Sequence, residues 1–371
     1  MAILPKDAGE ALLIGRAWVD GKVPGPSPVL VRGEDLLDLS SVAPTVSQLL
    51  ELERLPARLS SGGNFPVAGS LRSARLLAPV DLQAVKASGV TFVTSLLERV
   101  IEEQARGDPK RAMAIRGRVD ELVGGDLSRI KPGSSEAMAL KKVLMEQNAW
   151  SQYLEVGIGP DAEIFTKCPP MAAVGSGADI GVLRASTWNN PEPEIVLVVA
   201  SRGETVGATL GNDVNLRDVE GRSALLLGRA KDNNASCAIG PFIRLFDGRY
   251  SIDRVRRSDI ALVVEGEDGF RMEGVSSISK ISRDPLELVR QAMENHQYPD
   301  GLALFLGTMF APIQDRDAPG QGFTHKRNDT VRISTPDLGE LVNRVRYCDE
   351  IAPWNFGTGA LIRNLAQRGL L

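Results

Sequence analysis

The sequence predicts a protein body of the all-β or α+β class, and three observations support this expectation. Apolar runs of strand length recur from residue 163 onward. Helical patterns recur in the same region only at 284–296 and 357–368. Turns rich in Gly and Asp separate the apolar runs. Strands with so few helices between them argue against a doubly wound parallel sheet.

Residues 1–75 are expected to form a small, β-rich N-terminal domain, and residues 76–371 a larger second domain. Two short apolar runs, 12–15 and 29–31, are joined by a Gly- and Pro-rich segment, which is typical of strands and turns. Residues 43–55 have apolar side chains at helical spacing. The stretch that follows is rich in Pro, Gly, Ser and Arg, so we expect a loop there.

The second domain is expected to begin with a helical segment over residues 91–150. Its first helix, at 93–106, has one apolar face, formed by Val93, Leu96, Leu97, Val100 and Ile101. Two further helical stretches are expected near 110–122 and 134–149. Five apolar runs then predict strands, at 194–200, 206–210, 260–264, 302–306 and 331–334.

Charge and composition exclude several classes of protein. The chain has 43 Lys and Arg against 47 Asp and Glu, so its net charge is −4. This balance offers no basic surface for nucleic acid or for an anionic membrane. No apolar run approaches the roughly 20 residues of a membrane-spanning helix. Because the N-terminal residues lack a basic region followed by an apolar stretch, we expect a cytoplasmic protein.

Cysteine and histidine are too few to carry most kinds of chemistry. Cys168, Cys237 and Cys348 are scattered, which predicts neither a disulfide framework nor a cysteine-based zinc site. The only histidines are His296 and His325. If the protein is an enzyme, carboxylates and lysine are therefore expected to carry the reaction.

Two glutamates and an aspartate form a candidate metal site. Glu192 and Glu194 are two residues apart at the start of an apolar strand, so their side chains point to the same face. A hairpin connection at 201–204 would return the chain and deliver Asp213 beside the start of that strand. Three carboxylates suit a hard cation such as Mg²⁺. The alternative is a solvated sheet edge, and Pro193 between the glutamates suits an outer strand or a strand start at a rim.

Two other residues are candidates for proton transfer. Lys231 near a bound cation would have its ammonium form disfavoured and could act as a base; the alternative is a surface lysine paired with Asp232. Glu163 begins the strand-rich region, either as a buried acid or as the solvent-facing end of a strand. The Gly-Ser-Gly sequence at 175–177 looks phosphate-binding but does not open a helix, so we interpret it as a turn.

These residues belong to a longer pattern that resembles the fumarylacetoacetate hydrolase family over residues 80–350. The matching segments are 163–167 (Glu-Ile-Phe-Thr-Lys), 192–194 (Glu-Pro-Glu), 211–218 (Gly-Asn-Asp-Val-Asn-Leu-Arg-Asp), 240–242 (Gly-Pro-Phe) and 305–308 (Phe-Leu-Gly-Thr). The resemblance implies the family's α+β fold, a mixed β-roll with a helical insert. It also implies a Mg²⁺ ion, with Mn²⁺ as an alternative, held by Glu192, Glu194 and Asp213.

Within the family, the sugar-acid dehydratases resemble this chain more than the hydrolases do. The similarity lies in three segments, 87–92, 217–221 and 234–241. The hydrolases carry Tyr-x-x-His-x-x-Glu on the helix that enters the site, whereas this chain has Phe92, Ser95 and Glu98 at those positions. A water-activating His–Glu pair is therefore missing, which argues against C–C hydrolysis.

The resemblance implies dehydration of a small 2-keto-3-deoxy sugar acid, 2-keto-3-deoxy-D-xylonate, to 2,5-dioxopentanoate in oxidative pentose catabolism, by a homodimer or homotetramer. The substrate's carboxylate and 2-keto oxygen can chelate one divalent ion, which stabilises an enolate as a Lewis acid. We expect Lys231 to take the C3 proton and Glu163 to protonate the departing C4 hydroxyl. The residues expected to hold the substrate are Thr308 and Arg217 at its carboxylate and Ser95 or Glu98 at its distal hydroxyls.

Three other functions remain open for the same residues. An acylpyruvate-type C–C hydrolase and a 2-keto acid decarboxylase would both use the same metal–enolate chemistry. A metal-binding scaffold without catalysis is the third. The scaffold is disfavoured because three carboxylates, a lysine and a Gly-Thr turn occur together, and a scaffold needs no such set.

Overall fold

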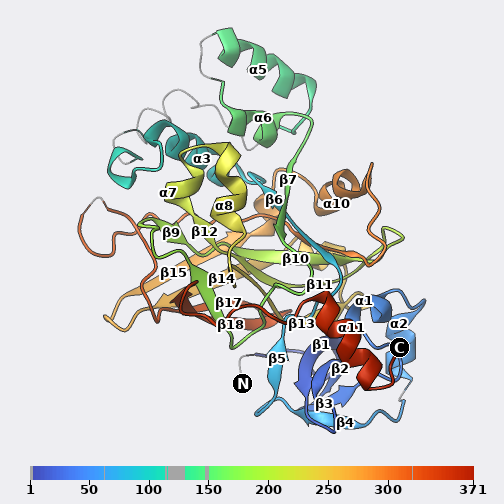
Figure 1. Ribbon diagram of the computed structural model, residues 1–371. Coiled ribbons are helices and arrows are strands. Elements are labelled where there is room, and N and C mark those ends of the chain that lie inside the picture. The colour runs from blue at the N-terminus through green and yellow to red at the C-terminus, as the bar shows by residue number, and fades with distance from the viewer. Residues whose placement is uncertain (1–2, 62, 113–114, 116–129, 147–149, 320) are drawn as a thin grey trace.

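Two β-sheets pack against each other in the body of the protein, and a group of helices stands above one end of them (Figure 1). This α+β arrangement confirms the fold class predicted from the sequence. The structure is a computed structural model, and it describes residues 3–61, 63–112, 115, 130–146, 150–319 and 321–371.

The larger sheet has 11 strands within these described residues. Across the sheet they are β4 (Val67–Ser70), β3 (Asp35–Asp38), β2 (Gly25–Arg32), β1 (Leu13–Val19), β13 (Cys237–Leu245), β11 (Thr205–Asp213), β10 (Pro193–Val199), β16 (Leu302–Phe305), β6 (Ala84–Gly89) and β7 (Glu163–Cys168), with β5 (Arg75–Leu77) paired to β1. Neighbours are antiparallel except β16 and β6, which run parallel.

The second sheet has five strands in the part of the chain that the structure describes. Their order is β15 (Arg271–Ser277), β14 (Asp259–Glu265), β17 (Thr330–Thr335), β18 (Gly339–Tyr347) and β8 (Asp179–Val182). A short separate pair, β9 (Asn189–Asn190) and β12 (Asn215–Leu216), lies at the same end as the helices (Figure 1).

The helices are mostly short. In chain order they are α1 (Val46–Leu50), α2 (Leu55–Ser60), α3 (Val93–Ala105), α5 (Ser135–Glu146), α6 (Gln152–Ile158), α7 (Arg217–Glu220), α8 (Leu227–Lys231), α9 (Ile252–Val255), α10 (Pro285–Met293) and α11 (Thr358–Gln367), with 3₁₀ turns η2 (Ala224–Leu226) and η3 (Ile278–Lys280). None of the described helices is long and apolar enough to cross a membrane.

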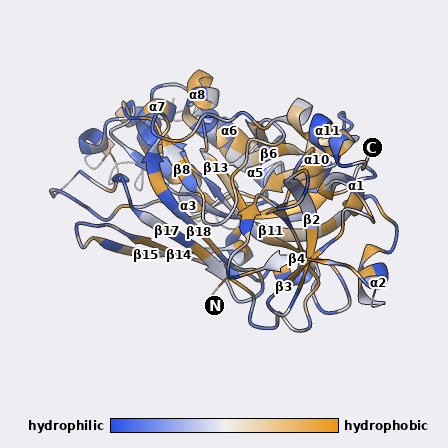
Figure 2. Cartoon of the chain, turned by 60° about the horizontal axis from the view of Figure 1, so that its bottom comes forward, coloured by the Kyte–Doolittle hydropathy of each residue, from blue (hydrophilic) through white to orange (hydrophobic). Residues whose placement is uncertain are grey.

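Strand β10 is buried on both of its faces, which explains its unbroken apolar run. Ile195 and Leu197 belong to the core between the two sheets. Val196 and Val198 point the other way, into a core that includes Val46 of α1. A strand covered on both sides has no reason to alternate polar with apolar residues. Figure 2 shows the hydrophobic colouring gathered along the central strands of the larger sheet.

Most of the predicted elements are confirmed. All five strands predicted within residues 194–334 are present, as β10, β11, β14, β16 and β17. The predicted helices at 93–106, 284–296 and 357–368 correspond to α3, α10 and α11. Helix α5 begins where expected, although 147–149 lie outside the described residues, as does most of the stretch at 110–122.

The expectation for residues 43–75 is wrong in two respects. The helix predicted over 43–55 is only the five-residue α1. The predicted loop after it contains helix α2 and strands β4 and β5. Pro56 lies in the first turn of α2, where its missing N–H would have no intrahelical partner anyway.

The N-terminal strands continue the larger sheet. Strand β1 pairs with β13 through Leu13 opposite Arg244 and Ile14 opposite Ile243. The domain boundary near residue 75 stays a prediction.

The helical segment has a small core of its own. Leu96 and Val100 of α3 pack with Leu144 of α5 and Leu154 of α6. In Figure 1, α5 and α6 stand above the sheets, and α3 lies beside α7. Arg99 of α3 contacts Glu192, which directly precedes β10. The segment therefore presents α3 to the end of the hairpin that carries the acidic residues.

Candidate active site

The β10–β11 hairpin brings the three predicted carboxylates together. Glu194 lies opposite Gly211, and the Asp213 amide donates a hydrogen bond to the Glu192 carbonyl at 3.1 Å. One carboxylate oxygen from each of Glu192, Glu194 and Asp213 lies within 4.8 Å of the other two. The expected hairpin geometry is therefore confirmed.

This cluster does not lie at a rim of the sheet, as Pro193 had led us to expect. The three carboxylates are 5%, 1% and 2% exposed, and β10 lies in the middle of the larger sheet. Pro193 is the first residue of its strand, which is the other position that a proline tolerates. The alternative of a solvated edge is excluded for Glu192 and Glu194.

Two lysines contact the carboxylates. The Lys231 ammonium lies 2.5 Å from Glu192 Oε2 and 3.1 Å from Asp213 Oδ2. Lys167, which is fully buried, lies 2.7 Å from Asp213 Oδ1. Burial alone would raise the pKa of Asp213, but these two ammonium groups outweigh it and hold that pKa below its usual value.

The same contacts decide the charge of Lys231. Burial would lower the pKa of this lysine, but Asp213, Glu192 and Glu220 outweigh burial and raise it. From the sequence, we expected a neighbouring metal ion to lower this pKa. A divalent ion would compete with Lys231 for Glu192 and Asp213, so the lowering of this pKa by such an ion stays a prediction. Lys231 is 2% exposed, which excludes the alternative of a surface lysine.

Glu194 is held on a backbone amide. The Gly307 N–H donates to Glu194 Oε2 at 2.5 Å. Gly307 has φ +87°, and a Cβ there would lie 2.1 Å from the Thr91 hydroxyl, so only glycine fits this turn. Burial, followed by the negative charges of Asp213 and Glu192, raises the pKa of Glu194 well above its usual value. The Lys231 ammonium and the Gly307 amide oppose this rise without cancelling it.

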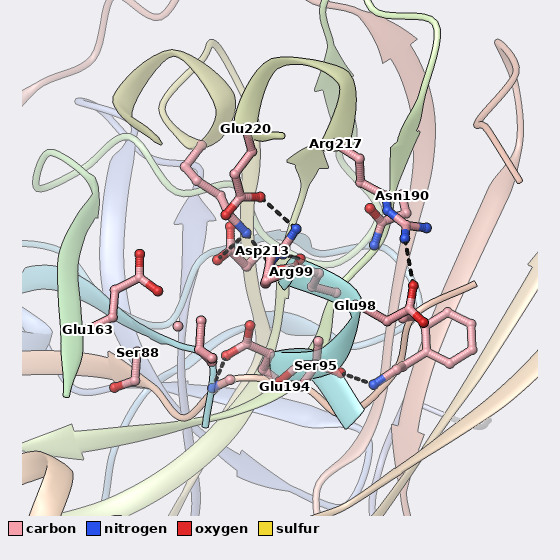
Figure 3. A pocket seen from close by; sticks show the side chains of 18 of the residues that line it. Ser88, Ser95, Glu98, Arg99, Glu163, Asn190, Glu194, Asp213, Arg217 and Glu220 are labelled. Atoms are coloured by element: carbon pink, nitrogen blue, oxygen red, sulfur yellow. Dashed lines mark hydrogen bonds and ion pairs between the residues drawn. The ribbon is translucent and has the colours of Figure 1, made fainter. Parts of the chain in front are cut away.

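Glu163 lies at the start of β7 and faces the same cavity (Figure 3). It pairs with Gly89 of β6, and a Cβ on Gly89 would lie 2.1 Å from Glu163 Oε2. Burial, reinforced by the charge of Glu220, raises the pKa of Glu163 to about 7. A carboxyl group with this pKa can give or take a proton near neutral pH.

Arg99 connects helix α3 to the acidic cluster. Its guanidinium lies 2.6 Å from Glu102, 2.7 Å from Glu192 and 2.8 Å from Glu220. Although burial opposes its charge, these three carboxylates hold the pKa of Arg99 well above its usual value. Glu220 still has a raised pKa, because its burial outweighs the attraction of Arg99 and Lys231.

Arg217 closes the other side of the cavity. Its guanidinium lies 2.7 Å from Glu102 and 3.2 Å from Glu98, and it donates to the Pro312 carbonyl at 3.1 Å. The guanidinium carbon is 4.2 Å from the centroid of a Trp188 ring, a cation–π contact. These contacts fix the guanidinium in one orientation.

The two predicted hydroxyl residues have local roles as well. The Ser95 hydroxyl donates to the Phe92 carbonyl at 2.8 Å and accepts from the Phe92 amide at 3.3 Å, so it closes the first turn of α3. The Thr308 hydroxyl donates to Ser276 at 3.3 Å and accepts from the Phe310 amide at 3.1 Å. Both residues line the cavity.

All nine residues singled out from the sequence line this one cavity: Ser95, Glu98, Glu163, Glu192, Glu194, Asp213, Arg217, Lys231 and Thr308. Neither His296 nor His325 does. Sequence reasoning missed five polar lining residues, which are Ser88, Arg99, Glu102, Asn190 and Glu220. A signal existed on α3, where Glu98 and Glu102 are one turn apart and interrupt a buried face.

The cavity carries a surplus of negative charge. Among the described residues that line it are seven carboxylates, against the three cationic side chains of Arg99, Arg217 and Lys231. In this structure Lys231 already holds a positive charge between Glu192 and Asp213. The donor set consists of oxygens only, which suits Mg²⁺. Two ligands of one Mg²⁺ lie at most about 4 Å apart, so the three carboxylates need to move only slightly to share an ion.

Comparison with known proteins identifies a family. The family described as fumarylacetoacetate (FAA) hydrolase C-terminal matches residues 138–346 of the chain, which is more than half of its length. A 2-dehydro-3-deoxy-D-arabinonate dehydratase of Saccharolobus solfataricus is 33% identical over 184 residues, 50% of this chain. That match spans only 58% of the relative's own length. A probable 2-keto-3-deoxyxylonate dehydratase of Haloferax volcanii is 26% identical over 84% of this chain and 86% of the relative.

Solved structures share the fold over nearly all of the chain. The apo form of a 2-keto-3-deoxy-D-arabinonate dehydratase matches with a TM-score of 0.63 and 22% identity, over 90% of this chain and 99% of the other. A structure described as the same dehydratase complexed with magnesium and 2,5-dioxopentanoate matches with a TM-score of 0.62 and 22% identity over the same shares.

Proposed function

The chain belongs to the fumarylacetoacetate hydrolase family, and we propose that it is a Mg²⁺-dependent lyase that dehydrates 2-keto-3-deoxy-D-xylonate to 2,5-dioxopentanoate. One observation carries this proposal. A buried set of three carboxylates lies in the same cavity as Lys231 and a glutamate whose pKa is about 7. Relatives named as dehydratases of 2-keto-3-deoxy pentonates, one of them a magnesium and 2,5-dioxopentanoate complex, support it.

In this proposal Glu192, Glu194 and Asp213 hold the metal ion. The raised pKa of Glu194 supports this assignment, because a divalent cation would remove the repulsion among the three carboxylates. When bound, the ion supplies Lewis-acid stabilisation of negative charge on the 2-keto oxygen of the substrate. Lys167 fixes the orientation of Asp213, and the Gly307 amide fixes that of Glu194.

Lys231 and Glu163 move the protons. Lys231 lies against two of the proposed metal ligands, so it can reach the carbon next to a 2-keto group bound there. We assign it the C3 proton, and we assign Glu163 the protonation of the departing C4 hydroxyl. With a pKa of about 7, Glu163 keeps a substantial protonated fraction at neutral pH, as an acid catalyst requires. Transfer of a proton from C5 to C3 of the unsaturated intermediate then gives an enol, and loss of its hydroxyl proton with protonation at C4 gives the C5 aldehyde.

The remaining lining residues orient the substrate. Thr308 lies next to Gly307, whose amide holds Glu194, so its hydroxyl is near the proposed metal and suits the substrate carboxylate. Arg217 is assigned to the same carboxylate. Ser95 and Glu98 come from the first two turns of α3 and are assigned to the distal hydroxyls.

Dehydration is favoured over C–C hydrolysis by the composition of the cavity. A hydrolase needs a base that activates water, and the family hydrolases use a histidine at the position of Ser95. Both histidines of this chain lie outside the cavity.

The direct test is incubation with 2-keto-3-deoxy-D-xylonate and Mg²⁺ and chemical detection of 2,5-dioxopentanoate. We expect product with Mg²⁺ and none after chelation, and loss of product in Glu192→Gln. Glu294→Gln, which changes an exposed glutamate, is the matched control. A higher kcat/KM for an acylpyruvate, or release of CO₂ from the sugar acid, would replace the proposal with hydrolysis or decarboxylation.

We also propose that the enzyme is cytoplasmic, acts in oxidative pentose catabolism and forms a homodimer or homotetramer. Light scattering after size-exclusion chromatography measures the assembly directly. A monomer at micromolar concentration would contradict the last of these statements.

A further inference from the structure

A second cavity lies at β1, which β13 and β11 separate from β10 in the larger sheet. It is enclosed by β1 and β5, the loop at 171–179 and the segment at 351–356, and its volume is about 590 Å³. Small-molecule sites have volumes of about 300–1,000 Å³ and combine apolar walls with a few polar groups. None of the residues assigned to the proposed reaction lines this cavity.

Arg16 is the unusual residue in its wall. Arg16 is only 4% exposed. Its Nη1 donates to the Met171 sulfur at 3.1 Å, and sulfur is a weak acceptor. Its Nε has no acceptor among the described residues. Burial lowers the pKa of Arg16, whereas a neighbouring carboxylate raises the pKa of an arginine.

The carboxylate that acts on Arg16 most strongly is already engaged elsewhere. This is Asp81, whose oxygens accept backbone N–H groups from Val46, Ser47 and Leu82. No ion pair of Arg16 occurs in the part of the chain that the structure describes. A buried charge without a partner costs several kcal/mol in general, so such a group is expected to meet an opposite charge.

The wall also contains aromatic and positively charged side chains. Trp18 lies on the same face of β1 as Arg16, and its ring meets Phe356 edge to face with centroids 5.3 Å apart. Arg75 lies over the Trp18 ring at 5.3 Å. Trp354, at 47% exposed, lines the opening.

The formal charge of the cavity is also positive. Three arginines line it, against one carboxylate, that of Asp179. Asp179 is already paired with Arg344 at 2.9 Å. The acidic residue in the wall is therefore not available to Arg16.

We propose that this cavity binds a small organic anion whose carboxylate or phosphate group pairs with Arg16 and whose flat apolar part packs against Trp18 and Trp354. The anion supplies the charge partner that Arg16 lacks. The indole rings supply stacking surface at little conformational cost. This site is separate from the proposed active site and does not depend on the proposed reaction.

The test is a calorimetric titration of the full chain with benzoate, phenyl phosphate and benzamide. Benzamide has the same shape as benzoate without the charge. We expect saturable binding of at least one anion and affinity at least tenfold lower for benzamide. The better of the two anions identifies the ligand as a carboxylate or a phosphate.

Variants locate the binding. Arg16→Met should weaken anion binding at least tenfold, and Trp354→Ala, which removes a half-exposed ring, should weaken it several-fold. Arg58→Met, which removes an exposed arginine outside the cavity, should leave the affinity unchanged. Because Arg16 has no charge partner, Arg16→Met should unfold at the wild-type temperature or above.

Several results would overturn the proposal. They are the absence of binding by both anions, equal binding of benzamide, and unchanged affinity in both Arg16→Met and Trp354→Ala. If the cavity is instead covered by a second copy of the chain, Trp354→Ala changes the oligomeric state and neither anion binds.

Discussion

The two cavities differ in the partners that they give to buried, positively charged side chains. Around Glu192, Lys231 contacts two carboxylates and Arg99 contacts three. Figure 3 shows one of these contacts, between Arg99 and Glu220. In the second cavity, Arg16 contacts a methionine sulfur and no carboxylate among the described residues. Lys231 and Arg16 are both buried, so the difference lies in the partners that the fold supplies.

This difference suits the two cavities to different tasks. In the acidic cavity, the chain itself balances part of the charge and holds each side chain in one orientation, which suits catalysis. In the Arg16 cavity, the chain leaves the charge unbalanced, which suits a ligand that brings its own charge. Five predictions test this comparison, from the largest expected effect to the smallest.

The first concerns turnover at Lys231. Lys231→Ala should lower kcat by about 10²–10⁴-fold, as expected for a lost general base, with KM changed far less. Lys231→Arg should not restore activity, because a guanidinium stays protonated and cannot accept the C3 proton. Wild-type turnover in the alanine variant, or rescue by arginine, would reduce Lys231 to a binding role and favour Glu163 as the base.

The second prediction compares the free energy of unfolding after removal of Lys231 and after removal of Arg16. Lys231→Met leaves Glu192 and Asp213 without their shared ammonium, and breaking a buried ion pair typically costs about 3–5 kcal/mol. Urea unfolding in the presence of a chelator should therefore show a large loss for Lys231→Met and none for Arg16→Met. Equal losses in the two variants would contradict the distinction between the cavities.

The third concerns the metal ligands. Glu192→Gln and Asp213→Asn should each weaken Mg²⁺ binding by about 100-fold or more, because loss of even an outer partner of a metal site costs about 10–100-fold. Isothermal titration calorimetry measures this affinity, with Glu294→Gln as the exposed control. Unchanged affinity in both variants would show that the ligands lie elsewhere.

The fourth concerns the support of Glu163. In Gly89→Ala, the new Cβ would lie 2.1 Å from Glu163 Oε2, so the carboxylate must move. A displacement of about 1 Å at a catalytic group can cost about 100-fold in rate. Gly69→Ala is the matched control, because a Cβ there meets no heavy atom within 4 Å. If both variants turn over at the wild-type rate, the position of Glu163 is not critical.

The fifth concerns pH. The folded state raises the pKa of Glu163 from 4.5 to about 7, so protonated Glu163 stabilises the fold. That stabilisation is complete below pH 4.5 and is lost as the pH rises through about 7. Allowing for its partial exposure, the loss is about 2 kcal/mol between about pH 5 and pH 8. Denaturant unfolding should show this loss in the wild-type chain relative to Glu163→Gln; parallel pH profiles would count against it.

Much of the acidic cavity could be predicted from local sequence. Glu192, Glu194 and Asp213 belong to one hairpin, where the two-residue period of a strand and a short turn decide which side chains meet. The apolar runs likewise located β10, β11, β14, β16 and β17. The same pattern could not place β10 in the middle of a sheet, because its two covering layers come from distant parts of the chain.

The sequence by itself therefore determined the strands, the acidic hairpin and the residue types available for proton transfer, because these follow from short-range periodicity and composition. The tertiary structure decided which charges are paired. Arg99 meets Glu192 across 93 residues and Arg217 meets Glu98 across 119, while Arg16 meets no carboxylate among the described residues. The groups that folding brings around a charged side chain decide whether its pKa shifts and whether it has a partner of opposite charge. No local sequence pattern encodes those groups.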